Sequence, residues 1–313
     1  MSKGATEQPR PDSPHQARIL ILGKSGQLGG ELARVFAGFG EVVTVGRESV
    51  DLADAAQLRA VVRAAAPDVI LNAAAYTAVD RAETESDLAL AINAHAPRIL
   101  AEEARHRNAL LVHYSTDYVF DGKKSEPWTE SDKPLPLNIY GASKLAGEQA
   151  IQQVGGNYLI FRTSWVYGPH GKNFLFTMLR LARERSTLSI VDDQFGAPTT
   201  SIELARATRD VLAGLLAGRF GSLQECSGIY HMTCAGSTSW FGFAEGIFAR
   251  ASTLLGLKTP ELIRIATKDY PTPATRPHNS VLSNAKLHAR FGVQLAPWEN
   301  ALREVMEAIK SQV

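Results

Sequence analysis

The feature that most constrains the fold is a short apolar segment that runs directly into a glycine turn. Arg18–Leu22 is continuously apolar after its first residue, which is typical of a strand buried on both faces of a sheet. Glycines follow at Gly23, Gly26 and Gly29, and residues 31–36 then have helical spacing. A buried strand, a glycine turn and a helix in direct succession predict the first unit of a parallel α/β sheet.

The rest of the first half repeats this alternation of buried strands and helices. Strands are predicted at 42–45, 68–71, 110–115 and 158–162, and helices at 55–65, 88–106 and 141–153. Strands that alternate with helices form a parallel sheet covered on both faces, and its ligand crevice lies at the carboxyl ends of the strands. The predicted fold class is therefore α/β, a Rossmann-type doubly wound parallel sheet with a smaller C-terminal substrate-binding domain.

The pattern loosens in the second half of the chain, and this change sets the predicted domains. Residues 1–17 are polar and rich in proline, which predicts a flexible tail. Residues 18–170 form the first predicted domain, joined by a returning segment near 197–233. Residues 171–313 are mainly the substrate domain, and include a proline-rich extended loop at 270–277.

Composition narrows the class of protein. The 313 residues carry a formal net charge of +1, which provides no basic field for nucleic acid or for an anionic membrane. No stretch resembles a signal peptide or a membrane span, and the two cysteines, Cys226 and Cys234, fit a reducing compartment. We therefore expect a cytoplasmic enzyme with a small-molecule substrate, either a monomer or a homodimer.

The glycine turn predicts a phosphate-binding site. A phosphate needs a tight turn, a backbone without Cβ atoms beside it, and the free N–H groups of a helix start. The spacing here is Gly-x-x-Gly-x-x-Gly rather than the stricter Gly-x-Gly-x-x-Gly, so close packing alone is an alternative explanation. Lys24 and Ser25 lack the rest of a P-loop, which argues against nucleotide hydrolysis.

The end of the second strand indicates which dinucleotide is bound. An acidic residue there binds the ribose 2′-hydroxyl of NAD, whereas an arginine accommodates the 2′-phosphate of NADP. The strand ends in Gly46 and Arg47, with Glu48 next, so we predict NADPH as the preferred cofactor and NADH as a weaker one. Asp51 and Leu52 are expected to frame the adenine.

Tyr140 and Lys144 are the candidate reacting pair. They stand one helical turn apart near the start of a helix, so they share a face. A nearby cation is expected to lower the pKa of a phenol, which makes the pair a proton donor. An exposed tyrosine beside a solvated lysine is the alternative, but Thr116 ends the preceding strand, where its hydroxyl can reach a carbonyl oxygen.

These residues belong to a set of strings that follow one another along most of the chain. They are Gly-Lys-Ser-Gly-Gln-Leu-Gly from Gly23, Asn-Ala-Ala-Ala-Tyr-Thr-Ala-Val-Asp from Asn72, Ser-Thr-Asp-Tyr-Val-Phe-Asp-Gly from Ser115, Tyr-Gly-Ala-Ser-Lys from Tyr140, Arg-Thr-Ser-Trp-Val-Tyr-Gly from Arg162, Asp-Gln-Phe-Gly-Ala-Pro-Thr from Asp193 and Pro-Ala-Thr-Arg-Pro-His-Asn-Ser from Pro273. Together they resemble the extended short-chain dehydrogenase/reductases, most closely the branch that reduces 4-keto groups of dTDP-linked deoxysugars.

The resemblance implies a role for each site residue. Tyr140 would be the general acid, Lys144 would tune it and hold the nicotinamide ribose, and Thr116 would bind the keto oxygen. The implied reaction is NADPH-dependent reduction of dTDP-4-dehydro-β-L-rhamnose to dTDP-L-rhamnose, or of a near relative. With the resemblance, the predicted cofactor contacts are Gly23, Ser25, Gly26, Gln27, Leu28, Gly29, Arg47, Asp51, Leu52, Ala73, Ala74, Ala75, Thr77, Tyr140 and Lys144.

The same resemblance implies a pocket for the sugar nucleotide. By this mapping, Thr116, Tyr118, Trp165 and Asn173 would line the sugar site, and Arg276 is the candidate contact for the diphosphate. The alternatives are that the aromatic side chains belong to the core and that Arg276 is a solvated loop residue.

The sequence departs from the family at two points. Some members have a magnesium ion that joins two subunits through glutamates; Glu31 fits the first position, but we expect no matching glutamate near Ala308 and predict no metal site. Relatives with aspartate at position 46 can use NADH, whereas this chain has Gly46.

Three alternatives stay open at this point. The first is a reductase that acts on a GDP- or UDP-sugar, and the second is a sugar-nucleotide epimerase of the same fold. The third is a non-catalytic NADP-binding module like the regulatory subunit of methionine adenosyltransferase, against which the intact set of Thr116, Tyr140 and Lys144 argues. The sequence leaves undecided the base of the sugar nucleotide and the stereochemistry at C4.

Overall fold

A computed structural model describes residues 17–311 of the chain. The predicted flexible tail, residues 1–17, therefore lies outside the described residues except for Ala17. No helix within residues 17–311 is long and apolar enough to cross a membrane.

A six-stranded parallel sheet forms the centre of the molecule, in the order β10-β5-β4-β3-β1-β2. Its register places Leu22 beside both Val45 and Asn72, so β1, β2 and β3 end at the same edge. The glycine turn lies at that edge, as the alternation of elements predicted. The strands are β1 (Arg18–Leu22), β2 (Glu41–Val45), β3 (Val69–Asn72), β4 (Leu110–Thr116), β5 (Asn157–Thr163) and β10 (Gly228–His231).

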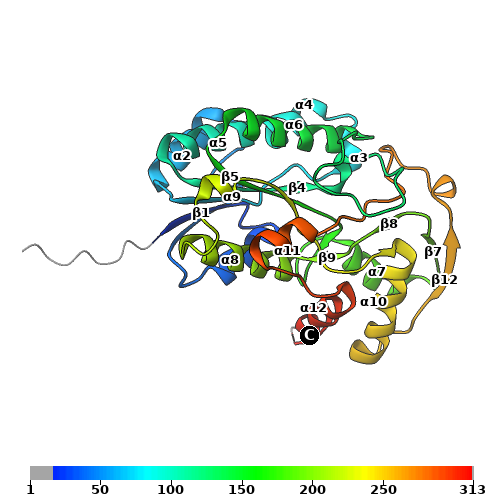
Figure 1. The fold of residues 1–313 in the computed structure, drawn as a ribbon. Coiled ribbons are helices and arrows are strands. Elements are labelled where there is room, and N and C mark those ends of the chain that lie inside the picture. The colour runs from blue at the N-terminus through cyan, green and yellow to red at the C-terminus, as the bar shows by residue number, and fades with distance from the viewer. Residues whose placement is uncertain (1–16, 312–313) are drawn as a thin grey trace, which may run out of the picture.

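Helices cover both faces of the sheet (Figure 1). One face packs against α2 (Ala55–Ala65), α5 (Ala96–Arg107) and α6 (Ile139–Val154). The other packs against α1 (Gln27–Val35), α8 (Ser201–Leu216) and α11 (Ala285–Phe291). The strands have apolar residues on both sides because both faces are buried, which confirms the predicted fold class.

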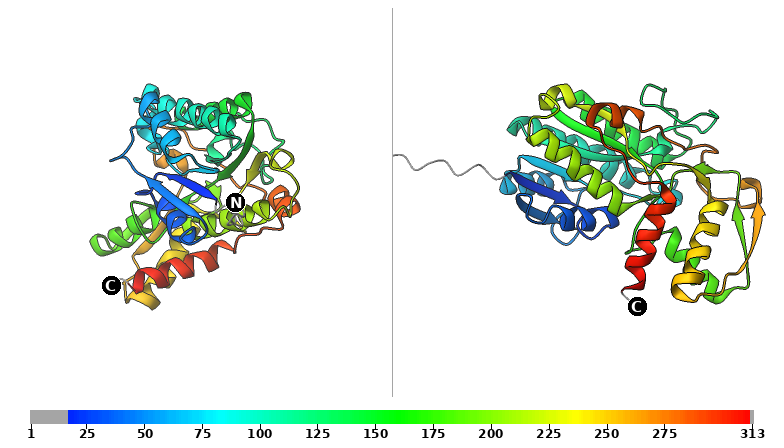
Figure 2. Two further views of the ribbon diagram at one scale, coloured as in Figure 1. Left: turned by 90° about the vertical axis from the view of Figure 1, so that its left-hand side faces the viewer. Right: turned by 60° about the horizontal axis from the view of Figure 1, so that its bottom comes forward.

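A second hydrophobic core lies beyond the carboxyl ends of the strands (Figure 2). It is built by α7 (Phe174–Glu184), α10 (Trp240–Leu255) and α12 (Trp298–Lys310), together with β7 (Thr187–Val191), which pairs in parallel with β12 (Glu261–Ile265).

Short strand pairs connect the two regions. β6 (Val166–Tyr167) pairs with β9 (Thr199–Thr200), and β8 (Phe195–Gly196) pairs with β11 (Thr238–Ser239). The remaining short helices are α3 (Val79–Ala82), α4 (Ser86–Leu90), α9 (Leu223–Cys226) and the 3-10 turns Asp117–Val119 and Thr267–Asp269.

The chain returns to the first region twice after it has entered the second. β10 adds to the sheet beside β5, and α8 packs against α1, as a returning segment near 197–233 would require. α11 also contributes Leu287 and Phe291 to the first core, which the sequence did not predict. The exact domain boundaries stay a prediction.

One helix differs from its prediction. Residues 88–106 were expected to form a single helix, but α4 and α5 are joined by a π-helical segment, Ala91–His95. Such segments insert extra backbone into a helix and are frequent at functional sites. The side chain of Asn93 in this segment accepts a hydrogen bond from the Tyr76 backbone N–H and donates to the Ser143 hydroxyl, which lies on α6.

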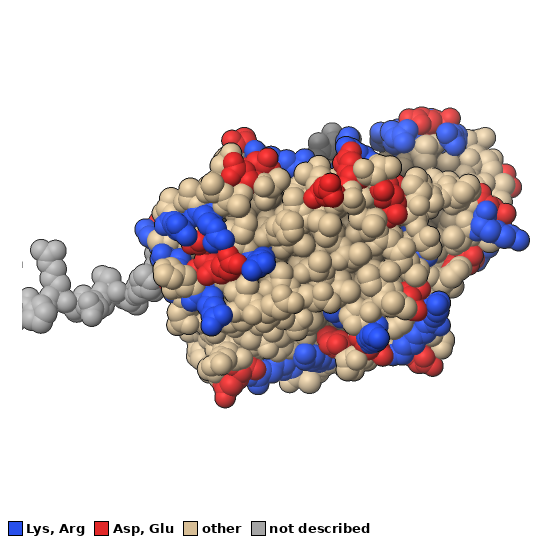
Figure 3. Space-filling model, turned by 90° about the horizontal axis from the view of Figure 1, so that it is seen from above, with Lys and Arg blue, Asp and Glu red and all other residues tan. Residues whose placement is uncertain are grey.

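Charged side chains of both signs are scattered over the face seen in Figure 3, mostly near its margins. That distribution agrees with the small net charge and gives this face no basic patch for a polyanion.

An ion pair between Glu148 on α6 and Arg162 on β5 is buried within the first region. Two hydrogen bonds of 2.9 and 2.6 Å join the two side chains, which are 1% and 2% exposed. The guanidinium also lies 5.1 Å from the ring centroid of Phe120. A buried charge of this kind is tolerated only because its partner is present.

We expect Glu148→Gln to lower the free energy of unfolding by about 3–5 kcal/mol, because it leaves the Arg162 charge buried without its counterion. Urea unfolding of the purified variant measures this loss. The joint replacement Glu148→Leu with Arg162→Met removes both charges and should recover most of the stability. Equal losses in the single and the joint variant would contradict this account.

Candidate active site

The glycine turn is packed directly against the ends of two neighbouring strands. The backbone N–H groups of Gly23 and Lys24 both donate to the Val45 carbonyl, at 2.8 and 3.2 Å. Gly23 has φ +90°, and a Cβ atom there would lie 2.9 Å from the Ala74 nitrogen. At Gly29 a Cβ atom would lie 2.0 Å from the Gly23 carbonyl oxygen. Side chains at Gly23 and Gly29 are therefore excluded, and the turn presents bare backbone.

The start of α1 suits an anionic group. No side chain caps this helix, and its first turn contains no acidic residue. Ser25 and Gly26 are exposed directly before it, and Gln27 and Leu28 form its first turn. The free N–H groups and the positive end of a helix dipole attract phosphate oxygens. The cradle therefore fits the diphosphate of a dinucleotide.

The other predicted cofactor residues surround this turn at the same edge. Arg47 is exposed just after β2, and Leu52 packs at the margin of the core. The Asp51 carboxylate accepts a hydrogen bond from the Ala53 backbone N–H, so it shapes its own loop. Ala73, Ala74, Ala75 and Thr77 follow β3, where Ala73 donates a backbone hydrogen bond to Leu22. Contacts of these residues with a cofactor stay predictions.

Tyr140 lies in the first turn of α6, directly beyond the carboxyl end of the sheet. The Asn138 side chain caps this helix by accepting a hydrogen bond of 2.7 Å from the Gly141 N–H. The Tyr140 ring meets the Tyr118 ring edge to face at 5.9 Å, and desolvation raises the pKa of Tyr140 to about 12. The expectation of a lowered pKa is therefore wrong for the protein alone, because burial raises the pKa more than the Thr116 hydrogen bond lowers it, and the Asp117 charge raises it further.

Lys144 is directed toward β4. Its Nζ donates to the Tyr114 carbonyl at 2.7 Å and lies 3.3 Å from His113 Nε2. Burial lowers the pKa of Lys144 to about 8, although Glu148 acts in the opposite direction. Burial therefore makes this ammonium group easier to deprotonate than an exposed lysine.

His113 is a site residue that the sequence analysis missed. Its ring is fully buried on β4, with Nδ1 lying 3.0 Å from Asn72 Nδ2 and Nε2 facing Lys144. Burial and then the Lys144 charge hold the pKa of His113 well below its usual range, so the ring is neutral. The sequence signal for this residue was its position as a polar residue within an otherwise apolar strand segment, 110–114.

Thr116 stands at the end of β4, as predicted, and its hydroxyl is already engaged. It accepts a hydrogen bond from the Tyr118 N–H at 3.1 Å and donates to Asp117 Oδ1 at 2.9 Å. The Thr116 side chain also lowers the pKa of Tyr140, which links the two groups. Thr116 and Tyr140 therefore meet at one point beyond the strand.

Asp117 is a second group that the sequence analysis did not single out. Its side chain is buried, and Oδ2 has no hydrogen-bond partner among the described residues. Desolvation raises the pKa of Asp117 to about 7, partly offset by the nearby hydroxyls of Ser280 and Thr116, of which Thr116 donates to Oδ1. The site thus holds a carboxyl group whose ionised form is disfavoured by burial.

Trp165 lies at the junction between the two regions in an unusual backbone conformation. Its φ is +46°, which bulky residues rarely adopt and which is found mostly where function requires it. Its ring stacks on Trp240 at 3.6 Å with an interplanar angle of 4°. Trp240 supports Trp165 from α10, and no motif in the sequence indicated this pair.

Two other predicted substrate residues have partners within the protein. The Asn173 side chain caps α7, and its Nδ2 donates to Gln27 Oε1 at 2.8 Å, which ties the second region to the glycine turn. Arg276 forms a paired contact with the Asp80 carboxylate at 3.0 and 2.9 Å. Their contacts with substrate stay predictions, and the Asp80 partner was missed by the sequence.

No group of three or more His, Cys, Asp or Glu side chains within residues 17–311 is arranged to hold a metal ion. Glu31 pairs with Arg34 at 2.8 Å. Glu304 and Glu307 precede Ala308 in α12, and the expectation that neither matches the family's second glutamate stays a prediction. Glu304 is paired with Arg206 on α8 at 2.6 Å.

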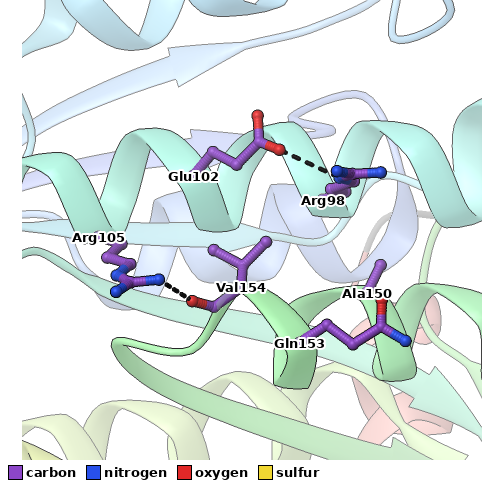
Figure 4. Close-up of a pocket in the computed structure, with 6 residues that line it drawn as sticks. All are labelled: Arg98, Glu102, Arg105, Ala150, Gln153 and Val154. Atoms are coloured by element: carbon purple, nitrogen blue, oxygen red, sulfur yellow. Dashed lines mark hydrogen bonds and ion pairs between the residues drawn. The ribbon is translucent and has the colours of Figure 1, made fainter.

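A depression between α5 and α6 is separate from the site. Arg98 bonds to Glu102 at 3.1 Å, and Arg105 donates to the Val154 carbonyl at 2.6 Å (Figure 4). Arg105 and Val154 lie in the last turns of their helices, whereas the candidate site adjoins the first turn of α6. The lining residues are Arg98, Glu102, Arg105, Ala150, Gln153 and Val154.

Comparisons with known proteins agree with this geometry. The family described as the RmlD substrate binding domain matches residues 17–311. The chain is 48% identical to the dTDP-4-dehydrorhamnose reductase of Burkholderia thailandensis, over 94% of this chain and 100% of that protein. This chain belongs to the dTDP-4-dehydrorhamnose reductase family.

Two further relatives extend the likeness. The dTDP-4-dehydrorhamnose reductase of Escherichia coli K12 is 41% identical over 93% of this chain and 97% of that protein. A crystal structure of the dTDP-4-dehydrorhamnose reductase of Bacillus anthracis, in complex with NADP, superposes with a TM-score of 0.86 at 36% identity, covering 94% of this chain and 99% of that one. The family resemblance seen in the sequence is thereby confirmed.

Asp117 leads to a prediction on pH and stability. Its pKa of about 7 in the folded protein lies above the unfolded value of about 3.9, so its contribution to stability is present below about pH 4 and is lost as pH rises to about 7. Asp117→Asn cannot ionise, so we expect the free energy of unfolding of this variant, relative to wild type, to increase over that interval. Urea unfolding across the interval measures the difference, and a constant difference would contradict the buried carboxyl account.

Proposed function

We propose that this member of the dTDP-4-dehydrorhamnose reductase family reduces the C4 keto group of dTDP-4-dehydro-β-L-rhamnose to give dTDP-L-rhamnose, with NADPH as the preferred reductant. The product is a nucleotide sugar used to build cell-surface polysaccharide. The observation that carries the proposal is that Thr116 ends β4 beside Tyr140 in the first turn of α6, at the same sheet edge as the glycine turn, with Lys144 one helical turn further on and bonded to the Tyr114 carbonyl.

The dinucleotide end has the features that cofactor binding requires. NADPH supplies a hydride when it is bound. The glycine turn and the start of α1 would hold its diphosphate, and Arg47 would contact the 2′-phosphate. Lys144 would donate to the nicotinamide ribose while keeping its bond to the Tyr114 carbonyl.

The protein's own residues would supply the proton that the reduced sugar oxygen takes up. Because the pKa of Tyr140 is about 12, its phenol keeps the proton at neutral pH until a stronger base is beside it. As negative charge develops on the sugar oxygen, Tyr140 Oη gives up that proton, and the Thr116 hydroxyl turns from Asp117 Oδ1 to donate its hydrogen bond to that oxygen. The Lys144 ammonium then favours the phenolate that remains.

The second region would hold the rest of the substrate. Tyr118 and Trp165 offer aromatic surface beside the reacting groups, and Asn173 joins this surface to the glycine turn. Arg276 would contact the diphosphate of the substrate. The diphosphate would then compete with the Asp80 carboxylate for the Arg276 guanidinium. Asp80 keeps the Arg276 side chain in place and balances its charge before the substrate arrives.

The test of this function is NADPH oxidation followed by absorbance. The purified protein is mixed with dTDP-4-keto-6-deoxyglucose and the epimerase that converts this sugar to dTDP-4-dehydro-β-L-rhamnose. Loss of NADPH absorbance that requires both the sugar and the epimerase supports the proposal. No loss, with NADPH binding still detectable, would contradict it and direct the search to other nucleotide sugars.

Tyr140→Phe removes the donated proton without altering the ring. We expect kcat to fall about 10²- to 10⁴-fold, the usual contribution of general acid catalysis. The Kd of NADP⁺ should change less than about twofold, because the lost interaction matters in the transition state. Stopped-flow turnover and fluorescence titration measure the two quantities. Tyr158→Phe on β5 is the matched control, and near-normal turnover in Tyr140→Phe would show that the proton comes from another group.

The cofactor preference is tested by steady-state kinetics with each reductant. Because Arg47 follows β2 where an acid would favour NAD, we expect kcat/KM to be higher with NADPH than with NADH. An equal or higher value with NADH would contradict the assignment.

A further inference from the structure

An ion pair lies at the end of β2 that the proposed cofactor contacts do not explain. Lys24 Nζ, in the glycine turn, is 2.7 Å from Glu48 Oε1, just beyond the strand. The two side chains are 41% and 55% exposed, so they remain accessible to a ligand. Neighbouring Arg47 is exposed and forms no ion pair with the residues that the structure describes.

The position of this pair is fixed by the backbone beneath it. Because Gly23 and Lys24 both donate to the Val45 carbonyl, the turn and the end of β2 meet at one point. In dinucleotide-binding sheets this point lies beside the adenosine ribose. The Lys24–Glu48 pair therefore bridges the two segments between which the 2′ position of a bound dinucleotide would lie.

Gly46 allows the Glu48 carboxylate to turn inward over the strand end. A Cβ atom at position 46 would lie 2.3 Å from Glu48 Oε2 and 2.9 Å from Oε1. The carboxylate thus occupies the space that a side chain at the strand end would fill. The hydrogen bond from Lys24 lowers the pKa of Glu48, which keeps the group ionised. An acid three residues beyond the strand is thereby brought to the strand end itself.

We propose that Glu48 and Lys24 set the choice between the two nicotinamide cofactors, an inference that rests on the proposed NADPH-dependent function. With NADH, Glu48 accepts a hydrogen bond from the ribose 2′-hydroxyl. With NADPH, Lys24 exchanges the Glu48 carboxylate for the 2′-phosphate, and Arg47 provides the second cation. Glu48 is then a specificity-determining residue that retains NADH use and limits NADPH affinity.

The electrostatics favour this division of roles. A phosphate monoester carries about 1.5 to 2 negative charges near pH 7, so a carboxylate at the same place repels it. Lysine and arginine form charge-assisted hydrogen bonds with phosphate oxygens, which are stronger than those with a neutral hydroxyl. Glu48 therefore weakens NADPH binding in two ways. It repels the 2′-phosphate, and its ion pair with Lys24 competes with the phosphate for that cation.

The test measures binding in the absence of sugar. NADP⁺, NAD⁺ and the fragment 2′,5′-ADP are titrated into wild type, Glu48→Gln and Lys24→Met by calorimetry. For Glu48→Gln we expect NADP⁺ and 2′,5′-ADP to bind about 3- to 10-fold more tightly, and NAD⁺ about 3- to 10-fold more weakly, the range of one exposed ionic hydrogen bond. For Lys24→Met, NADP⁺ should weaken about tenfold and NAD⁺ less than about twofold.

A second variant tests the geometry without touching either charge. The φ of Gly46 is not in the positive range, so alanine fits its backbone, but the added Cβ displaces the Glu48 carboxylate. Gly46→Ala should therefore shift the ratio of NADP⁺ to NAD⁺ affinity in the same direction as Glu48→Gln. Glu41→Gln breaks the exposed Arg18–Glu41 pair at the opposite end of β2 and is the matched control that should leave this ratio unchanged.

The outcomes separate this inference from the proposed function. An unchanged ratio in both Glu48→Gln and Gly46→Ala overturns the inference, even if wild type reduces the sugar. The expected shift in binding, together with no sugar reduction, supports the role of Glu48 and Lys24 while the proposed substrate fails.

Discussion

The close contact of the glycine turn with the ends of β2 and β3 is the constraint on which the rest of the site depends. Gly23 and Lys24 bond to Val45, while Gly23 lies against Ala74 with no room for a side chain. This contact brings the N-terminus of α1, the loop after β2 and the segment after β3 to one edge of the sheet. The parallel register then places the end of β4, with Thr116, on the same edge.

Burial determines the protonation states around the reacting groups. Desolvation raises the pKa of Tyr140 and Asp117 and lowers the pKa of Lys144 and His113, so the charged form is disfavoured in each. The Glu148–Arg162 pair is the exception, since each ion has its partner within hydrogen-bond distance. The site therefore holds a neutral phenol and a neutral imidazole beside the Lys144 ammonium and a compensated ion pair, an arrangement suited to moving one proton.

Contacts between distant parts of the chain join the two regions at the carboxyl end of the sheet. Asp80 holds Arg276, Gln27 holds Asn173, and Trp240 supports Trp165 in its strained conformation. In each case a residue with a proposed substrate role is fixed by a partner on another element. The substrate side is thus preorganised by side-chain contacts, whereas the cofactor side is formed mainly by backbone.

Much of the fold and the centre of the site could be predicted from the sequence. The continuously apolar strands, the glycine spacing and the helix at 55–65 are local signals, because burial and backbone freedom act on neighbouring residues. The family strings pointed to Thr116, Tyr140 and Lys144, whose catalytic roles stay predictions.

Only the tertiary structure decided which groups meet. The π-helical segment with Asn93, the return of α11 to the first core, the Asp80–Arg276 pair and the inward turn of Glu48 depend on contacts across the chain. The pKa of Tyr140 was mispredicted because residue spacing along a helix reports a neighbouring charge but not desolvation. Sequence by itself determined the kinds of chemical group and their order, and packing decided their solvation and their partners, since both depend on residues brought together only by folding.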